Sequence, residues 1–264
     1  MLLNLDRMGG LRWVLVLISV LVMLFLILPV AFIVALSFGS SQWLAFPPPG
    51  WTLRWYHEFF ADPRWLAAIW TSAKIGVLVM ISSTLLGLLA SFALVRGRFR
   101  GRETLRAAFL TPMILPVVVV AVALYAFFLK VGLNGTLLGF VIAHTVLALP
   151  FAIIPISTAL AGFDKSVEDA AILCGASPWE ARLRITLPSI RHGLFAAVVF
   201  SFLVSWDEVV IAIFMASPTL QTMPVRIWGS LRQDLSPVIA AASSLLILLT
   251  LALMLLAALL RKKG

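Results

Sequence analysis

The chain has 264 residues, of which 62% are hydrophobic and only 12% are charged, so it lacks the polar residues that would cover a soluble domain of this length. The apolar content excludes an intrinsically disordered chain, and a single cysteine, Cys174, excludes a disulfide-stabilised extracellular scaffold. The composition therefore predicts a membrane protein. For such a protein the formal net charge of +9 reports on topology rather than on nucleic-acid binding.

Six apolar stretches are long enough to cross a bilayer, whose hydrocarbon core of about 30 Å takes roughly 20 helical residues. The fifth stretch in chain order is crossed by the acidic pair Asp207 and Glu208. We therefore expect an all-α polytopic fold that forms one transmembrane domain over residues 1–264. The expected spans are 13–38, 70–95, 107–129, 137–160, 193–216 and 237–260.

The basic residues are divided unevenly between the two sides of these spans. Of the 20 lysines and arginines, 14 lie on the side of the termini, including Arg7, Lys263 and five arginines between Arg96 and Arg106, while five lie on the other side. Because basic residues are retained on the cytoplasmic side, we expect both termini in the cytoplasm of a bacterial inner membrane. The first span exceeds the roughly 7–15 apolar residues of a signal peptide and is expected to be retained.

The external segment 39–65 is rich in aromatic residues and prolines. Thr52 can cap a short helix that ends near Asp62 and Pro63. This helix is expected to lie in the membrane interface. Its aromatic side chains fit either an anchoring belt at headgroup depth or a docking surface for an external partner.

The cytoplasmic segment 161–192 predicts two short helices joined by a turn. Asp164 or Ser166 can cap the first helix, and Gly175 fits the left-handed position that ends it. Ser177 to Glu180 form a capping box for the second helix, which Pro188 is expected to terminate. A DNA-binding helix-turn-helix is excluded because the unit is tethered between two membrane spans.

The small residues near the turn, Ala170, Ala171 and Gly175, allow a partner's surface to approach the backbone of the loop closely, although packing against the chain's own helix ends would favour them too. Glu168 and Asp169 are expected in the first helical turn, where the helix dipole favours anions. Cys174, next to the turn, is expected to be a small buried thiol rather than a nucleophile.

The order Asp169-Ala170-Ala171, Gly175 and then Ile185 to Pro188 resembles the EAA loop of ABC-importer permeases, the inner-membrane components of binding-protein-dependent transport systems. One departure is that Asp169 stands where the family usually has Glu, although Glu168 precedes it. The resemblance implies a type I ABC-importer fold and an ATPase-coupling role for the loop. The residues that it assigns to coupling are Glu168, Asp169, Ala170, Ala171, Gly175, Ser177, Ile185, Leu187 and Pro188.

Beyond the loop, residues 205–210, 220–228 and Ser236-Pro237 look like the polyamine (spermidine/putrescine) branch of these permeases, in particular its second subunit. The resemblance implies a second permease subunit, two ATP-binding-cassette subunits that dock on the loop and carry ATP and Mg, and a periplasmic substrate-binding protein. Permeases for other small solutes, such as opines or γ-aminobutyrate-like compounds, share parts of these motifs and stay open.

The sequence has no ATPase or metal site of its own. A P-loop needs a lysine directly after a glycine, and none of the five lysines follows one. The three histidines, His57, His144 and His192, are scattered along the chain. We therefore expect a transport subunit that is not an enzyme and binds no cofactor or metal.

Four ionisable residues fall inside the expected spans, where each is costly unless it is paired or faces water: Lys74, His144, Asp207 and Glu208. An acidic residue could compensate an ammonium substrate, or it could pair with Lys74 to hold helices in register. Adjacent residues on a helix point about 100° apart, so Asp207 and Glu208 are expected to face different partners. Trp206 could offer a cation–π face, or it could be packed.

Prolines in the third and fourth expected spans, including Pro116, Pro150 and Pro155, should bend them. Such bends suit alternating access. The same intramembrane charges would also serve a self-contained secondary transporter or channel, and a purely structural membrane subunit would use them only for pairing.

Overall fold

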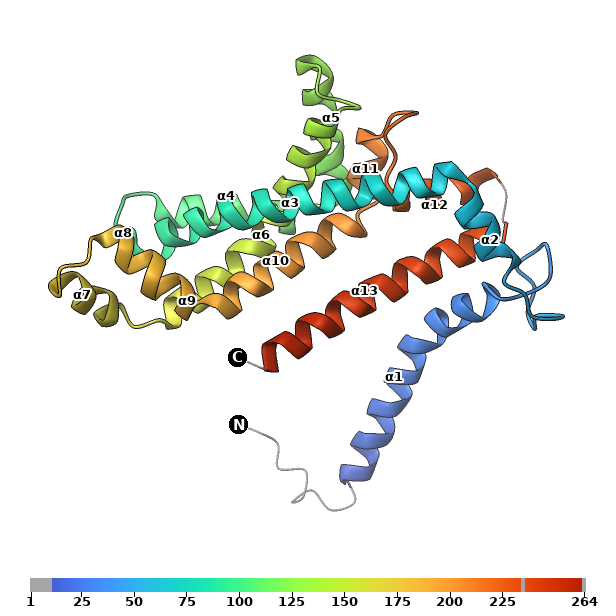
Figure 1. The fold of residues 1–264 in the computed structure, drawn as a ribbon, viewed down its shortest axis with the longest axis horizontal. Coiled ribbons are helices and arrows are strands. Elements are labelled where there is room, and N and C mark those ends of the chain that lie inside the picture. The colour runs from blue at the N-terminus through green and yellow to red at the C-terminus, as the bar shows by residue number, and fades with distance from the viewer. Residues whose placement is uncertain (1–10, 234–235, 263–264) are drawn as a thin grey trace. The chain divides into compact units, whose positions relative to one another are not determined.

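The computed structural model describes residues 11–233 and 236–262, so Arg7 and Lys263 lie outside the described residues. The described residues form helices and no β-strand (Figure 1), which confirms the all-α prediction. The helices are α1 (Leu11–Leu36), α2 (Arg54–Ala61), α3 (Pro63–Arg96), α4 (Arg102–Ile114), α5 (Val117–Val131), α6 (Leu137–Gly162), α7 (Lys165–Leu173), α8 (Pro178–Ala181), the π-helix η2 (Arg182–Thr186), α9 (Leu187–Ser189), α10 (Arg191–Trp206), α11 (Val210–Met215), α12 (Met223–Gln233) and α13 (Val238–Lys262).

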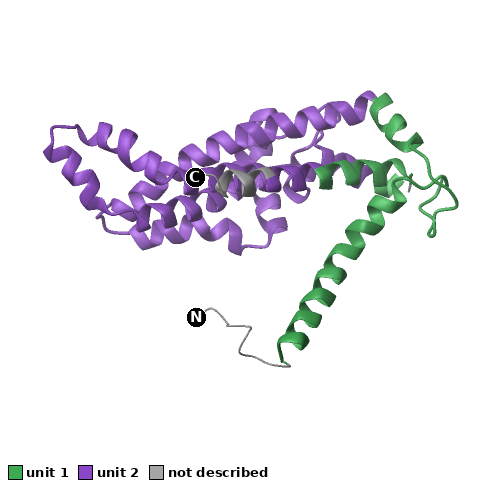
Figure 2. Cartoon of the chain, turned by 60° about the horizontal axis from the view of Figure 1, so that its bottom comes forward, with its two compact units in different colours: residues 1–62, 230–248 green, residues 63–229, 249–264 purple. Residues whose placement is uncertain are grey.

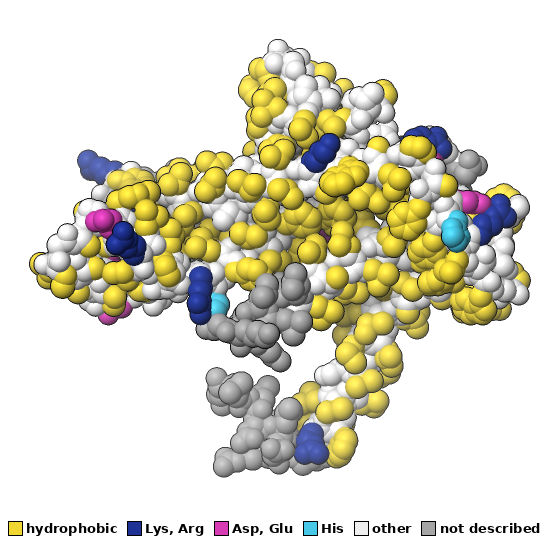
Figure 3. All heavy atoms as spheres, in the orientation of Figure 1, with side chains coloured by type: hydrophobic (Ala, Val, Ile, Leu, Met, Phe, Trp, Pro, Cys, Tyr) yellow, Lys and Arg dark blue, Asp and Glu magenta, His cyan; other side chains and the backbone are white. Residues whose placement is uncertain are grey.

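Four of these helices are long and apolar enough to cross a membrane alone: α1, α3, α6 and α13. They coincide with the first, second, fourth and sixth expected spans. The second begins earlier than expected, at Pro63, so α3 takes in the last residues of the segment assigned to the outside. Hydrophobic side chains cover most of the visible surface (Figure 3), as lipid-facing helices require.

The third expected span, 107–129, is not one helix. The axes of α4 and α5 meet at 104°, and Leu115 between them has extended dihedral angles. The cause is Pro116, which lacks an N–H and disfavours a helical conformation at the residue before it. Pro150 and Pro155 do not break their span, since both lie inside the continuous helix α6.

Two compact units make up the chain (Figure 2), one from residues 1–62 and 230–248 and the other from 63–229 and 249–264. In the first unit, α2 confirms the short helix expected after Thr52, whose hydroxyl accepts a hydrogen bond from the Arg54 N–H (3.1 Å). The Trp55 indole donates to the Gly39 carbonyl at 2.6 Å, and the Tyr56 and Ser37 hydroxyls are hydrogen-bonded at 2.7 Å. These bonds hold α2 against the end of α1.

The core of the second unit is a bundle in which α3, α6 and α10 run side by side (Figure 1). Glycines let the backbones approach. A Cβ at Gly87 of α3 would lie 2.7 Å from the Ala152 Cβ of α6, and a Cβ at Gly193 of α10 would lie 2.7 Å from the Pro155 carbonyl oxygen. Small residues serve this purpose in membrane bundles, where packing rather than the hydrophobic effect joins helices.

We predict that Gly193→Ala lowers the thermal stability of the purified permease, although alanine normally favours a helix over glycine by about 1 kcal/mol. The added methyl would press on the Pro155 backbone, and such overpacking typically costs about 1–3 kcal/mol. Gly229→Ala in α12 is the matched control, because a Cβ there meets nothing within 4 Å. Equal melting temperatures for the two variants in detergent would contradict the close approach of α10 to α6.

Candidate functional site

The loop between α6 and α10 folds as a helix pair whose ends are capped as the sequence predicts. The Asp164 carboxylate accepts a hydrogen bond from the Ser166 N–H at 2.9 Å, which caps α7. Ser177 and Glu180 form the reciprocal capping box of α8. Hydrogen bonds from Ser166 and Ser177 hold the pKa values of Asp164 and Glu180 below their usual range, so both carboxylates stay charged at neutral pH.

Gly175 ends α7 with a φ of +98°, in the left-handed region that the sequence required. The Gly175 N–H donates to the Ile172 carbonyl at 3.0 Å, and the Ala176 N–H donates to the Ala171 carbonyl at 3.1 Å. This is the Schellman arrangement, which satisfies the last carbonyls of the helix. The turn thus confirms the predicted role of the glycine.

Pro188 does not end the second loop helix, contrary to the prediction. The chain continues through η2 into α9, which contains Pro188, and the sharp turn follows at Ile190. In η2 the Leu187 N–H bonds to the Arg182 carbonyl, five residues back. This wider turn makes room for the proline ring, which would otherwise meet a carbonyl four residues earlier.

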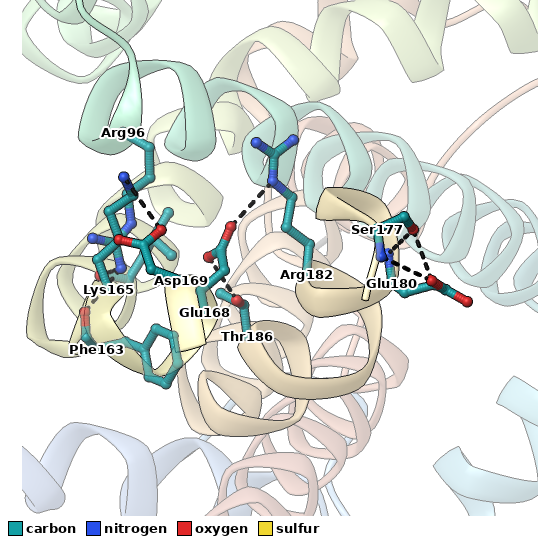
Figure 4. Close-up of polar contacts among 10 residues, drawn as sticks. Arg96, Phe163, Lys165, Glu168, Asp169, Ser177, Glu180, Arg182 and Thr186 are labelled. Carbon is teal, nitrogen blue, oxygen red and sulfur yellow. Dashed lines mark hydrogen bonds and ion pairs between the residues drawn. The ribbon is translucent and has the colours of Figure 1, made fainter. Parts of the chain in front are cut away.

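The acidic residues Glu168 and Asp169 have different surroundings (Figure 4). Glu168 is buried and joins α7 to the second half of the loop, because its carboxylate accepts a hydrogen bond from the Thr186 hydroxyl at 2.9 Å and pairs with Arg182 Nε at 3.4 Å. Asp169 is exposed and lies 3.6 Å from Lys165 Nζ. Asp169, not Glu168, is therefore available to another protein.

The loop is also attached to the bundle. The Arg96 guanidinium, at the end of α3, donates to the carbonyls of Leu160 and Phe163 at 3.3 and 2.8 Å, as Figure 4 shows for Phe163. The Arg182 guanidinium lies 5.8 Å from the centre of the Phe92 ring. These contacts join the loop to α3 as well as to α6.

The outer surface of the loop is apolar around the turn. Leu173 is 88% exposed and Trp179 is 62% exposed, and Ala170 beside them is also exposed. Cys174 is exposed too, so the expectation of a buried thiol was wrong. The residue is the C-cap of α7, directly before the turn at Gly175.

The fifth expected span is interrupted at its acidic pair. Helix α10 ends at Trp206 and α11 begins at Val210, so Asp207 and Glu208 lie in the break between them. The expectation that both acids lie on one helix, about 100° apart, was therefore wrong. The Glu208 carboxylate is buried and accepts hydrogen bonds from the N–H groups of Ile211 (2.9 Å) and Ala212 (2.8 Å). Asp207 is exposed and makes no ion pair with any described residue.

The remaining intramembrane residues do not form the pair between an acid and Lys74 that the sequence analysis considered. His144 Nε2 of α6 lies 3.6 Å from a Glu208 oxygen, and His144 Nδ1 is hydrogen-bonded to the Ser205 hydroxyl at 3.0 Å.

Lys74 is exposed on α3 and pairs with no acid in the described part of the chain. Trp206 is packed, 3% exposed and stacked on Phe202. The hydrogen bond of Ser205 to His144 was not predicted, because the two residues are 61 positions apart and no local sequence pattern indicates their contact.

The bundle of long apolar helices and the capped loop define a multi-pass membrane permease. The sequence matches the family of binding-protein-dependent transport system inner membrane components over residues 83–263. It is 31% identical over 224 residues to the putrescine transport system permease protein PotI of Escherichia coli K12, covering 82% of this chain and 79% of that protein. It is 29% identical to the spermidine/putrescine transport system permease protein PotC of the same strain, covering 82% of each chain.

A solved structure of a bacterial alginate ABC transporter, in complex with an alginate pentasaccharide-bound periplasmic protein, has the same fold with a TM-score of 0.73. The sequence identity is 17%, over 96% of this chain and 94% of that chain. The chain belongs to the family of binding-protein-dependent inner-membrane components, and it is a permease subunit of an ABC importer.

We predict that Glu168→Ala unfolds the loop locally, because it leaves the Thr186 hydroxyl buried without a partner, at a cost of about 1–3 kcal/mol. Amide hydrogen exchange should accelerate across α7 and η2. Asp169→Ala is the matched control and should leave the protection of both elements unchanged, since its carboxylate is exposed. Equal protection in the two variants would show that Glu168 does not hold the helices together.

Proposed function

We propose that this permease imports polyamines such as putrescine and spermidine, or similar small organic cations, across the bacterial inner membrane by alternating access. The names of its relatives PotI and PotC support this substrate class. The observation that carries it is the exposed carboxylate of Asp207 at the break in the fifth span.

Three features make this end of α10 suited to a cation. Asp207 is the C-cap residue, so its charge adds to the negative end of the helix dipole. The break leaves α10 carbonyls that have no partner farther along the helix. No described basic residue pairs with the Asp207 carboxylate, so a substrate ammonium group would compensate it. Broken helices bind cations in the same way in other transporters.

The proposed assembly contains a second permease subunit, two ATP-binding-cassette subunits and a periplasmic substrate-binding protein. ATP and Mg are bound by the ATP-binding subunits, and this chain binds neither. Leu173, Trp179 and Asp169 form the exposed part of the loop that would contact an ATP-binding subunit. The charge distribution supports cytoplasmic termini, on the same side as this loop.

The proposed mechanism follows from the connections of the loop. Closure of the ATP-binding subunits would displace the capped helix pair, which continues directly into α6 on one side and α10 on the other. Because Asp207 lies at the far end of α10, the displacement reaches the carboxylate and changes the side from which it is accessible.

We predict that Asp207→Asn raises the KM for putrescine uptake about tenfold, which corresponds to about 1.4 kcal/mol of lost attraction. The complex should still assemble, and its basal ATPase activity should survive, because the carboxylate supports no described residue. The control is Glu103→Gln, on the exposed first turn of α4. An unchanged KM for both putrescine and spermidine would move the substrate away from cations.

We predict that Gly175→Val uncouples ATP hydrolysis from uptake. A Cβ at this position meets no atom within 4 Å, but valine is strained at a φ of +98°, so the turn should shift and displace α8. Gly162→Val is the control, because that glycine also has open space but no positive φ. Normal uptake per ATP hydrolysed in Gly175→Val would show that the geometry of the turn is not needed for coupling.

A further inference from the structure

The break in the fifth span needs a capping group that its own N-cap residue cannot supply. Val209 is the N-cap of α11 and has a hydrocarbon side chain. The first N–H groups of a helix have no partner within it, and at the buried residues Ile211 and Ala212 water does not replace the missing partner. The chain would therefore favour an unbroken helix here unless another residue accepted those hydrogen bonds.

Glu208 is that residue. One carboxylate oxygen accepts from the Ile211 N–H and the other accepts from the Ala212 N–H, so both oxygens are engaged with the first turn of α11. The side chain is buried, and it points toward α11, the next helix in the chain. The capping geometry explains why the chain can leave the helical path between Trp206 and Val210.

The same carboxylate is braced from a second helix. His144 of α6 is fully buried, and its Nε2 faces a Glu208 oxygen at 3.6 Å and bonds to no other described group. The ring is itself held by the Ser205 hydroxyl and by the edge-on ring of Phe140. Glu208 is thus confined between α6 and the start of α11.

We infer that Glu208 is a positioning residue that keeps the break open and so holds Asp207 exposed at the end of α10, with His144 as its brace. The two adjacent acids then have separate tasks. Glu208 is directed inward and satisfies backbone groups, whereas Asp207 is directed outward and stays free for substrate. This inference rests on the proposed role of Asp207 in binding a cation.

The position of residue 207 can be measured without reference to substrate. In a permease that carries Asp207→Cys and Cys174→Ser, expressed with its partner subunits in cells, a cationic methanethiosulfonate should label the new thiol. Glu208→Gln should slow the labelling at least fivefold. The glutamine replaces one carboxylate oxygen by an NH₂ group, which would face a backbone N–H and weaken the cap that keeps the break open. Rates within twofold of each other with and without Glu208→Gln would overturn the inference.

Variants of His144 provide a second test if Glu208→Gln assembles poorly. His144→Asn can keep the bond to Ser205 but no longer reaches Glu208, whereas His144→Gln can still reach the carboxylate. Labelling at residue 207 should slow in His144→Asn and stay near the parental rate in His144→Gln. The reverse order, or equal slowing in both, would contradict the bracing role.

Uptake of putrescine then separates positioning from a general loss of structure. Glu208→Gln should raise the KM about tenfold in the parental protein and add nothing in the Asp207→Asn protein, since the carboxylate that it positions is gone. If the effects of Glu208→Gln and Asp207→Asn on KM are instead fully additive, Glu208 does not act through Asp207. If Asp207→Asn alone leaves the KM unchanged, the proposed function fails, while the labelling experiment still decides whether Glu208 positions residue 207.

Discussion

A helix that breaks in apolar surroundings releases backbone N–H and carbonyl groups that only the protein itself can satisfy. The break between α10 and α11 meets this requirement with the Glu208 carboxylate, which accepts from two N–H groups at once. The break between α4 and α5 has one such group fewer to satisfy, because Pro116, the N-cap of α5, has no N–H. Each interruption of the spans is therefore tied to a particular side chain, and the positions of the breaks follow from where those side chains stand.

The same requirement shapes the loop between α6 and α10. Asp164 and Ser177 satisfy N–H groups at the starts of its helices, and the turn at Gly175 satisfies carbonyls at the end of α7. Glu168 then joins the two halves through Thr186 and Arg182. With its ends capped and its halves joined, the loop is held together by its own hydrogen bonds, as the proposed coupling to the ATP-binding subunits would require.

The parts of the site that depend on neighbouring residues could be predicted from the sequence. The capping box at Ser177, the cap at Asp164 and the positive φ at Gly175 all involve residues within a few positions of one another, so their order in the chain determines the geometry. The apolar lengths of α1, α3, α6 and α13 likewise located four spans.

The parts that depend on distant residues could not be predicted. Nothing local distinguishes buried Glu168 from exposed Asp169, because the difference comes from Thr186, 18 positions away. Glu208 meets His144 of another helix rather than Lys74, and the order of residues in two separate helices does not show which of their side chains face each other. Pro188 does not end its helix as predicted, because the π-helix η2 directly before it accommodates the proline ring.

The contacts between α6 and α10 connect the loop with the acidic pair. Near the loop, Gly193 brings α10 against Ala159 and the Pro155 backbone of α6. At the opposite end of α10, Ser205 is hydrogen-bonded to His144 of α6, next to the break. The two helices that enter and leave the loop are thus joined at two levels, about 18 Å apart along α10 from Gly193 to Ser205. In the proposed mechanism a displacement of the loop would move them as a pair, and Asp207 would follow while the hydrogen bonds of Glu208 stay in place.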